Sequence, residues 1–332
     1  MKESITDRID AVTKIGDLRL KMGGIQPAPK SVKIELTARC SLRCKYCAVR
    51  TRTKKPKPDM DFYYFQKITE DMRISGVEEI GLFYLGESFM NPILLVDAIK
   101  WCKRLGFQWL FLTSNAVNAD PLAVRQCMDA GLDSLKWSVN WADLKQFQEV
   151  TGGSEAQFVH ALEHIREAWQ GRAQNGGFNT IISASSILYE GEQLKKMQTM
   201  LDENVRPFVD KHYWLPLYQM SMYKDKLEKE LGYIPTAGNC GRIDDTTMQP
   251  TTPNLPCWCT ITEGHVRVDG GLSACGFGAD DRFDMGILDG TNFMRQWNSP
   301  KFVELREAQL RTLKEGQNAL KGTICEVCVA YD

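Results

Sequence analysis

The chain has 332 residues, enough to bury a sizeable core as one large barrel or as a barrel with an appendage. Its 41 basic and 42 acidic side chains leave a formal net charge of -1, which does not favour a nucleic-acid partner or an acidic membrane surface. No apolar run approaches membrane-spanning length, and residues 1–14 lack the apolar core of a signal peptide. With 11 cysteines and no export signal, we expect metal ligands or free thiols and a reducing, cytoplasmic location.

Short apolar runs alternate with longer amphipathic stretches from Ser31 to about Leu217, as in parallel strands joined by crossover helices. Strands are predicted at 32–36, 79–84, 109–113, 134–139, 179–185 and 208–214. Helices are predicted at 62–75, 92–105, 121–130, 154–170 and 192–203. The pattern predicts an α/β fold, a partial (β/α)6 TIM-like barrel, whose chemistry belongs at the carboxyl ends of its strands.

The residue composition changes after Leu217, where prolines and glycines interrupt a segment of low helical propensity. Beyond it we expect a short hairpin over 264–272 and a helix over 302–314. The chain is therefore divided into an N-terminal extension (1–30), a barrel (31–220), a linker (221–255) and a small C-terminal domain (256–332).

Three cysteines follow the first predicted strand with C-x3-C-x2-C spacing: Cys40, Cys44 and Cys47. A four-iron cluster held by three thiolates keeps one iron open to a substrate or cosubstrate. Zinc is the alternative, but structural zinc normally takes four ligands, and no nearby Cys or His completes this triplet. The spacing favours an open 4Fe-4S cluster.

Through Cys40 to Cys47, with the aromatic Tyr46 before the last cysteine, the chain resembles the radical S-adenosylmethionine (SAM) enzymes. The resemblance implies that SAM chelates the open iron. It also implies that one electron cleaves SAM to methionine and a 5'-deoxyadenosyl radical, which takes a hydrogen atom from the substrate. An external electron donor such as flavodoxin or ferredoxin is implied as well.

Further matches to the family lie after the next strands. Gly86-Glu87-Ser88 is similar to the family's Gly-Glu-Pro stretch, which receives the methionine ammonium, although Ser88 departs from it. Tyr46 matches the aromatic near adenine. Taken singly, such residues are also explained as turn formers, core residues or surface charges. The remaining expected SAM contacts are Ser114, Asn115, Ser138, Asn140 and Arg172.

A second cysteine group lies in the C-terminal domain: Cys257, Cys275, Cys325 and Cys328. Four thiolates can close a site, and structural zinc is an alternative to iron. With the surrounding stretches 256–258 and 296–300, these cysteines resemble the Twitch form of the SPASM domain, which holds one auxiliary 4Fe-4S cluster. Two 4Fe-4S clusters are therefore expected.

Four cysteines fall outside these sets. Cys102 and Cys127 lie in predicted helices and are interpreted as small buried hydrophobes. Cys259 and Cys240 are candidate catalytic thiols, because a thiol can donate a hydrogen atom to a substrate radical and so invert a carbon centre. Structural or ligand roles are the alternatives for both.

Twitch-type relatives include enzymes that oxidise or epimerise sugar alcohols of aminoglycoside pathways, whereas many SPASM relatives modify ribosomal peptides. Only about thirty residues precede the first strand, and no winged-helix unit that captures leader peptides is expected there, so a small polar, sugar-like substrate is favoured. The spare thiols favour epimerisation. Dehydrogenation with the auxiliary cluster as electron acceptor, peptide modification, and a non-catalytic iron-sulfur or zinc protein are the alternatives.

Overall fold

The computed structural model describes residues 4–47, 49, 55–174, 179–216, 242–251, 255–276, 278, 281–326 and 328. Over these residues one sheet runs in the order β6-β5-β4-β3-β2-β1-β7-β8-β9. Its strands are β1 (Ser31–Ile34), β2 (Glu79–Gly81), β3 (Trp109–Ser114), β4 (Ser134–Ser138), β5 (Ile181–Ile187), β6 (Lys211–Leu215), β7 (Glu263–Val266), β8 (Gly271–Ser273) and β9 (Asp284–Ile287).

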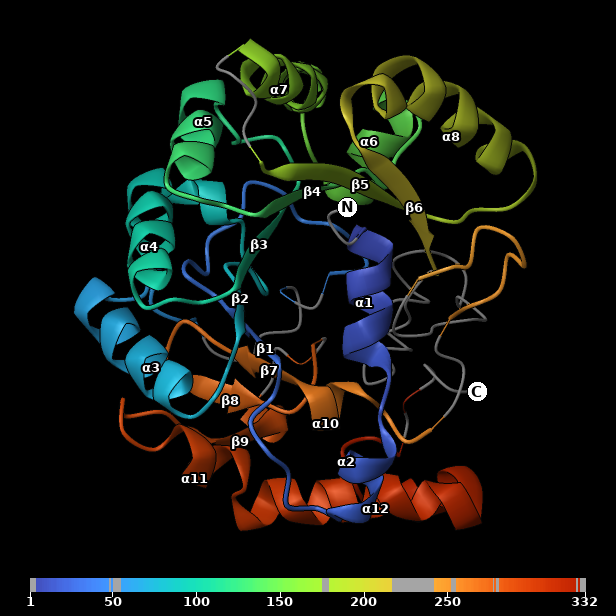
Figure 1. Ribbon diagram of the computed structural model, residues 1–332. Coiled ribbons are helices and arrows are strands. Elements are labelled where there is room, and N and C mark those ends of the chain that lie inside the picture. Colours follow the sequence, from blue (N-terminus) through green and yellow to red (C-terminus); the bar gives the residue numbers. More distant parts are fainter. Residues whose placement is uncertain are drawn as a thin grey trace.

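Strands β1 to β6 are all parallel, and their crossover helices form a layer outside the curved sheet (Figure 1). The α/β partial barrel predicted from the sequence is confirmed, with strand and helix ends within a few residues of the prediction. The helices are α3 (Phe62–Ile74), α4 (Pro92–Arg104), α5 (Pro121–Asp129), α6 (Leu144–Thr151), α7 (Glu155–Gln174) and α8 (Gly191–Asn204). Short 3-10 helices are η2 (Ser88–Met90) and η3 (Arg206–Phe208).

Local chemistry explains where these elements begin and which way they face. The side chains of Asp61, Asn91 and Asp120 accept backbone hydrogen bonds at the starts of α3, α4 and α5. In β3, Leu110 and Leu112 are buried in the core shared with the helices, while the alternate residues are partly exposed and line the barrel lumen. The sheet therefore has one face packed against the helices and another face that lines the lumen.

The C-terminal part of the chain extends the barrel sheet. Strand β7 pairs in parallel with β1, with Lys33 opposite His265, and then β8 and β9 follow in antiparallel order. The predicted hairpin and C-terminal helix are present. The other elements of this part are α10 (Cys259–Thr262), η5 (Asp281–Phe283), α11 (Phe293–Trp297), α12 (Pro300–Glu315) and η6 (Gly316–Leu320).

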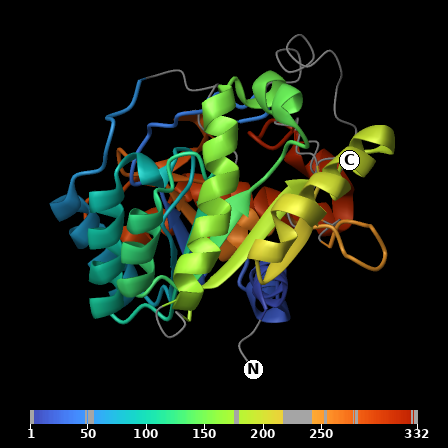
Figure 2. The ribbon, with the colours of Figure 1, turned by 90° about the horizontal axis from the view of Figure 1, so that it is seen from above.

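The N-terminal extension contains two helices that the sequence analysis did not predict, α1 (Ile5–Thr13) and α2 (Asp17–Lys21). Helix α1 lies inside the ring of strands in Figure 1, and Figure 2 places it at one end of the barrel. Arg8 of α1 pairs with Glu79 at 2.5 Å, and its guanidinium stacks 3.9 Å above the ring of Trp109. Because both partners begin their strands, α1 closes the amino end of the barrel.

No helix in the part of the chain that the structure describes is both long and apolar enough to cross a membrane.

Candidate functional site

The segment with the three cysteines follows β1 and is docked on the end of α6. The backbone N–H groups of Arg43 and Lys45 donate to the carbonyls of Thr151 (2.8 Å) and Val150 (2.9 Å), and Leu42 is buried beneath them. These contacts hold the segment at the carboxyl ends of the parallel strands, where barrel chemistry is expected.

The three thiols of this segment lie close enough to influence one another electrostatically. Burial raises the pKa of Cys40 to about 12, with smaller contributions from Glu87 and Cys47. Burial and then the Cys47 and Cys40 thiols raise the pKa of Cys44. Thiolate ligation by iron removes this penalty on ionisation, so the three residues fit a cluster that needs deprotonated sulfur.

In the described part of the chain, no three His, Cys, Asp or Glu side chains are arranged to hold a single metal ion. A cubane places each cysteine on a different iron, so its ligands do not have to converge on one point.

The Gly86-Glu87-Ser88 stretch packs against the chain that enters the cysteine triplet. A Cβ atom on Gly86 would lie 1.9 Å from the carbonyl oxygen of Thr37, and Glu87 N–H donates to the Arg39 carbonyl at 2.8 Å. Only glycine permits this close backbone approach. The stretch is thereby held beside the triplet.

Glu87 is buried, and its two carboxylate oxygens accept from backbone N–H groups. Oε1 accepts from Phe89 at 3.2 Å and Oε2 from Asn115 at 2.8 Å. Burial raises the pKa of Glu87, and these N–H donors oppose the rise. The Ser114 hydroxyl is a third hydrogen-bond partner of this carboxylate, whose two oxygens, with about four lone-pair sites, still have capacity for a ligand cation. The Asn115 Nδ2 lies 3.6 Å from the Cys40 Sγ, so the structure brings Glu87, Asn115 and the triplet together.

Tyr46 and Asn140 meet at the same end of the barrel. Asn140 Nδ2 donates to the Tyr46 hydroxyl at 3.0 Å, while its Oδ1 accepts from Ile187 N–H at 3.0 Å. The Tyr189 hydroxyl donates to the Asn140 carbonyl at 2.9 Å. This network fixes the aromatic ring that precedes Cys47.

The three serines predicted as SAM contacts differ in their surroundings. The Ser88 hydroxyl is buried and donates to the Leu82 carbonyl at 2.6 Å, and Ser114 Oγ accepts from Ala116 N–H at 3.0 Å. The Ser88 hydroxyl therefore shapes its loop, while Ser114 also hydrogen-bonds the Glu87 carboxylate. Ser138 is the last residue of β4, partly exposed and paired in register with Ser185.

Arg172 requires a correction. Its guanidinium donates to the Thr180 carbonyl at 3.1 Å, forms an ion pair with Asp210 and stacks 4.0 Å from the Trp169 ring. Thr180 and Asp210 directly precede β5 and β6, so Arg172 lies at the amino ends of the strands, opposite the cysteine triplet. The predicted SAM contact is wrong at this position, because the polarity of the crossover helix carries its carboxyl end to the other side of the barrel.

The four C-terminal cysteines are brought together. Burial raises the pKa of Cys325 well above its usual value, and Cys257, Cys275 and Cys328 raise it further. The Tyr84 hydroxyl, from the barrel, donates to the Cys275 carbonyl at 2.6 Å. The electrostatic influence of the other three thiols on Cys325 fits the predicted four-thiolate site, and the Tyr84 contact ties that site to the barrel mouth.

The cysteines outside the two groups are buried wherever the structure describes them. Cys102 and Cys127 are completely buried, as predicted. Cys259, the first residue of α10, is buried in a cluster with Trp258, Val12 and Ile15. Cys240 lies outside the described residues.

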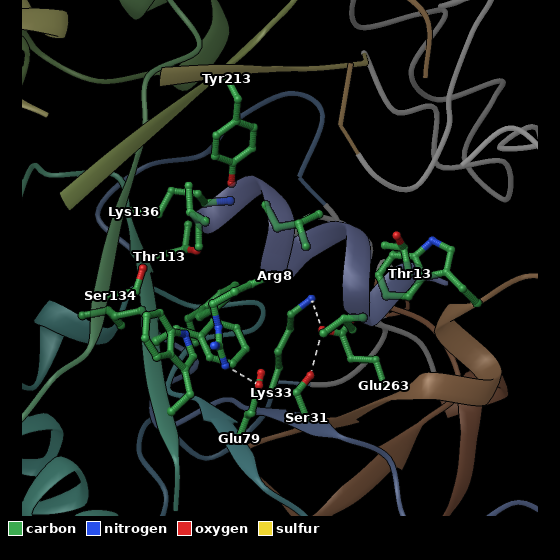
Figure 3. A pocket seen from close by; sticks show the side chains of 18 residues that line it. Arg8, Thr13, Ser31, Lys33, Glu79, Thr113, Ser134, Lys136, Tyr213 and Glu263 are labelled. Atoms are coloured by element: carbon green, nitrogen blue, oxygen red, sulfur yellow. Dashed lines mark hydrogen bonds and ion pairs between the residues drawn. The ribbon is translucent and has the colours of Figure 1, made fainter. Parts of the chain in front are cut away.

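A pocket that is partly open to solvent lies between α1 and the lumen face of the sheet (Figure 3). Trp258 and Glu263 complete its wall from the C-terminal part of the chain, while Cys259 is not among the described lining residues. The hydrogen-donor role of Cys259 stays a prediction. The sequence analysis missed this chamber because nothing in residues 5–13 indicates that they enter the barrel. Its polar lining residues include Arg8, Ser31, Lys33, Glu79, Thr113, Ser134, Lys136 and Tyr213.

A thiol triplet, a buried carboxylate and polar strand ends, above a lumen whose amino end is covered by α1, define an α/β barrel with a candidate iron-sulfur site. The family model described as the radical SAM superfamily matches residues 34–200, and the chain belongs to this superfamily. Membership implies SAM and a 4Fe-4S cluster.

Curated relatives match only part of this chain. The PqqA peptide cyclase of Methylobacterium nodulans is 30% identical over 131 residues, which are 40% of this chain and 34% of that protein. The tungsten-containing aldehyde ferredoxin oxidoreductase cofactor-modifying protein of Pyrococcus furiosus is 25% identical over 145 residues, 42% of this chain and 39% of that protein. The matches thus span less than half of either relative.

Solved structures match nearly the whole chain at low identity. Streptococcus suis SuiB bound to its precursor peptide SuiA superposes with a TM-score of 0.62 and 13% identity, over 95% of this chain and 72% of SuiB. BtrN in complex with AdoMet and 2-DOIA superposes with a TM-score of 0.55 and 14% identity, over 91% of this chain and 94% of BtrN. These likenesses establish a shared fold.

Proposed function

We propose that the protein is a radical SAM enzyme that removes a hydrogen atom from a small polar substrate held in the barrel lumen. The observation that carries the proposal is the position of Cys40, Cys44 and Cys47 beside Glu87 and Asn115, at the mouth of a barrel with an internal chamber. A radical source at the mouth and a substrate in the chamber are the two parts that such a reaction needs.

When bound, the cluster and SAM supply the radical that the superfamily uses for hydrogen abstraction. The protein's own residues have separate roles. Glu87 offers its remaining acceptor capacity to the methionine ammonium, and the Tyr46–Asn140 pair fixes an aromatic surface for adenine. Helix α1 closes the amino end of the lumen, which limits access of water to a reactive intermediate.

The proposal includes an auxiliary 4Fe-4S cluster on Cys257, Cys275, Cys325 and Cys328, and dehydrogenation as the net reaction. These four cysteines would hold the cluster, which would supply an acceptor for the electron that a substrate radical loses, together with a proton, when a C=O or C=N bond forms. Two observations favour this outcome over epimerisation: the four thiols lie together, and Cys259 does not line the chamber. Epimerisation would leave carbon-bound deuterium in a product formed in deuterated water, whereas dehydrogenation would not.

Peptide modification is the second candidate function. It is favoured by the relatives, since PqqA peptide cyclase is named for a peptide and SuiB is seen with a precursor peptide. The space in this pocket that water-sized molecules can occupy, about 130 Å³, admits a small molecule or a peptide side chain and not a folded partner.

The test is SAM cleavage by anaerobically reconstituted protein with dithionite, measured as 5'-deoxyadenosine. Cys44→Ala should lower its formation by more than about 100-fold, because a lost ligand costs more than a lost outer-shell contact. Cys127→Ala is the matched control, since this buried cysteine lies in α5, away from both cysteine groups. Zinc in place of iron, or equal activity in the two variants, would remove the enzyme proposal.

A further inference from the structure

The charges that line the chamber do not cancel. Arg8 pairs with Glu79 at 2.5 Å, and Lys33 pairs with Glu263 at 2.8 Å. The fifth charged lining residue is Lys136, and no described carboxylate lies within salt-bridge distance of its ammonium group. The lining therefore carries one positive charge beyond its ion pairs.

Lys136 occupies the middle of β4 and points into the lumen. It is paired in register with Thr113 and Ser183, and it lies two residues before Ser138, the predicted SAM contact. Figure 3 shows its side chain between Tyr213 and Thr113, directed toward α1. The side chain is partly exposed, and because it lines the chamber this exposure faces the lumen. The ammonium is thus available to a molecule inside the barrel.

The surroundings disfavour the charge on Lys136. Burial lowers its pKa to about 8, Lys33 lowers it further, and distant Glu263 only partly opposes the change. Its nearest aromatic contact is the Tyr213 ring, 6.0 Å from Nζ. A buried ammonium without an anion is costly, and a bound anion offsets this cost.

We propose that Lys136 binds a carboxylate group of the substrate in the barrel lumen. This inference rests on the proposed function, because it places the substrate in the chamber below the SAM site. One ammonium matches the single charge of a carboxylate, and the hydroxyl groups of Thr113, Ser134 and Tyr213 line the same chamber as further donors. Phe83 and Phe111 provide apolar walls for the rest of a small acid.

Matched acidic and neutral probes test the proposal by binding to reconstituted protein with SAM. D-glucuronate is compared with D-glucose, and N-acetyl-L-alanine with N-acetyl-L-alaninamide, by calorimetric titration. At least one acid should bind about tenfold or more tightly than its neutral partner, as expected for a hydrogen bond to a charged group. Preference within the glucuronate pair indicates a sugar acid, and preference for N-acetyl-L-alanine over its amide indicates an amino-acid or peptide carboxylate; both support the proposal.

Lys136→Met should abolish the preference for the acid, and Lys136→Arg should retain most of it because the charge remains. Lys145→Met is the control, since Lys145 is exposed on α6 and should leave the preference unchanged. Equal binding of both acids and their neutral partners by the wild-type protein, or an unchanged preference in Lys136→Met, overturns the proposal. If Lys136→Met does not fold, Lys136→Gln replaces it. The comparison of acids with their neutral partners on the wild-type protein still tests the proposal.

Failure of this inference is distinguishable from failure of the proposed function. Formation of 5'-deoxyadenosine without any carboxylate preference rejects the role of Lys136 alone. Absence of 5'-deoxyadenosine rejects the radical chemistry, whatever the probes show.

Discussion

Lys33 and Glu263 are an ion pair between β1 and β7, the two strands that join the barrel to the C-terminal part of the chain. Burial alone would oppose ionisation, but the Lys33 ammonium at 2.8 Å and His265 lower the pKa of Glu263 to about 2. Burial lowers the pKa of His265, which keeps its ring neutral near pH 7. Glu263 is therefore held as a carboxylate mainly by one neighbour.

We predict that Lys33→Met lowers the free energy of unfolding at pH 7 by about 3 kcal/mol, because it leaves Glu263 buried and charged without its partner. Glu263 has a folded pKa below its ordinary value of 4.5, so its stabilising contribution is present above pH 4.5 and is lost as the pH falls toward about 2. Other carboxylates with lowered pKa values titrate in both proteins, so the stability advantage of the wild-type protein over Lys33→Met should shrink across this window. Urea unfolding at a series of pH values measures both effects.

The double variant Lys33→Met/Glu263→Gln is the control, since it removes the unpaired charge and should recover most of the lost stability. A single variant that is as stable as the wild-type protein at pH 7 would contradict the prediction.

At the scale of the element, α1 is held by its lumen face and by one external ion pair. Ile5, Ile9 and Val12 line the chamber, and Asp10 pairs with Arg242 at 2.9 Å. Ala11 is exposed on the same helix. A nine-residue helix is marginal in isolation, so its stability depends on these tertiary contacts.

Ile9→Asp should weaken the docking of α1 by about 2 kcal/mol, because it places a carboxylate against an apolar wall beside Glu79. The measurement is hydrogen exchange, with faster exchange expected for the amides of residues 5–13. Ala11→Asp is matched in charge and propensity and should leave the exchange nearly unchanged. Equal rates in the two variants would show that α1 is not held by its lumen face.

At the scale of the whole molecule, Arg306 of α12 connects segments that are distant in the sequence. It is completely buried, and its guanidinium donates to the carbonyls of Thr260 (2.6 Å), Gly24 (3.2 Å) and Trp297 (2.7 Å). The ring of Phe302 lies 3.8 Å from the guanidinium carbon. Burial lowers the pKa of Arg306 to about 9. One side chain thus joins the N-terminal segment, α10, α11 and α12.

Arg306→Met should lower the free energy of unfolding by about 3 kcal/mol, because several buried carbonyls lose their donor. Arg306→Lys should recover little, since an ammonium cannot reproduce the planar fork of donors. Guanidinium-induced unfolding followed by tryptophan fluorescence measures the loss. The control is Arg311→Met, because Arg311 is exposed and lies one to two turns further along α12; this substitution should have little effect on the free energy of unfolding. A small effect of both Arg306 substitutions on that free energy would contradict the structural role of Arg306.

Much of the barrel could be predicted from the sequence because its signals are local. The alternation of buried and exposed residues in 109–113, the prolines at the starts of α4 and α5, and the acidic and amide caps all act within one or two turns of chain. The spacing of Cys40, Cys44 and Cys47 is equally local, and it placed the triplet at the correct end of the first strand.

Other features depend on which distant segments meet, and only the tertiary structure decided them. Nothing local indicates that α1 enters the lumen, that Lys33 acquires a partner from β7 while Lys136 has no described carboxylate partner, or that Arg172 lies at the amino ends of the strands. Composition and periodicity determine the elements and the kind of chemistry. The environment of each charge is determined by packing, since desolvation and pairing depend on neighbours that the linear order of residues does not specify.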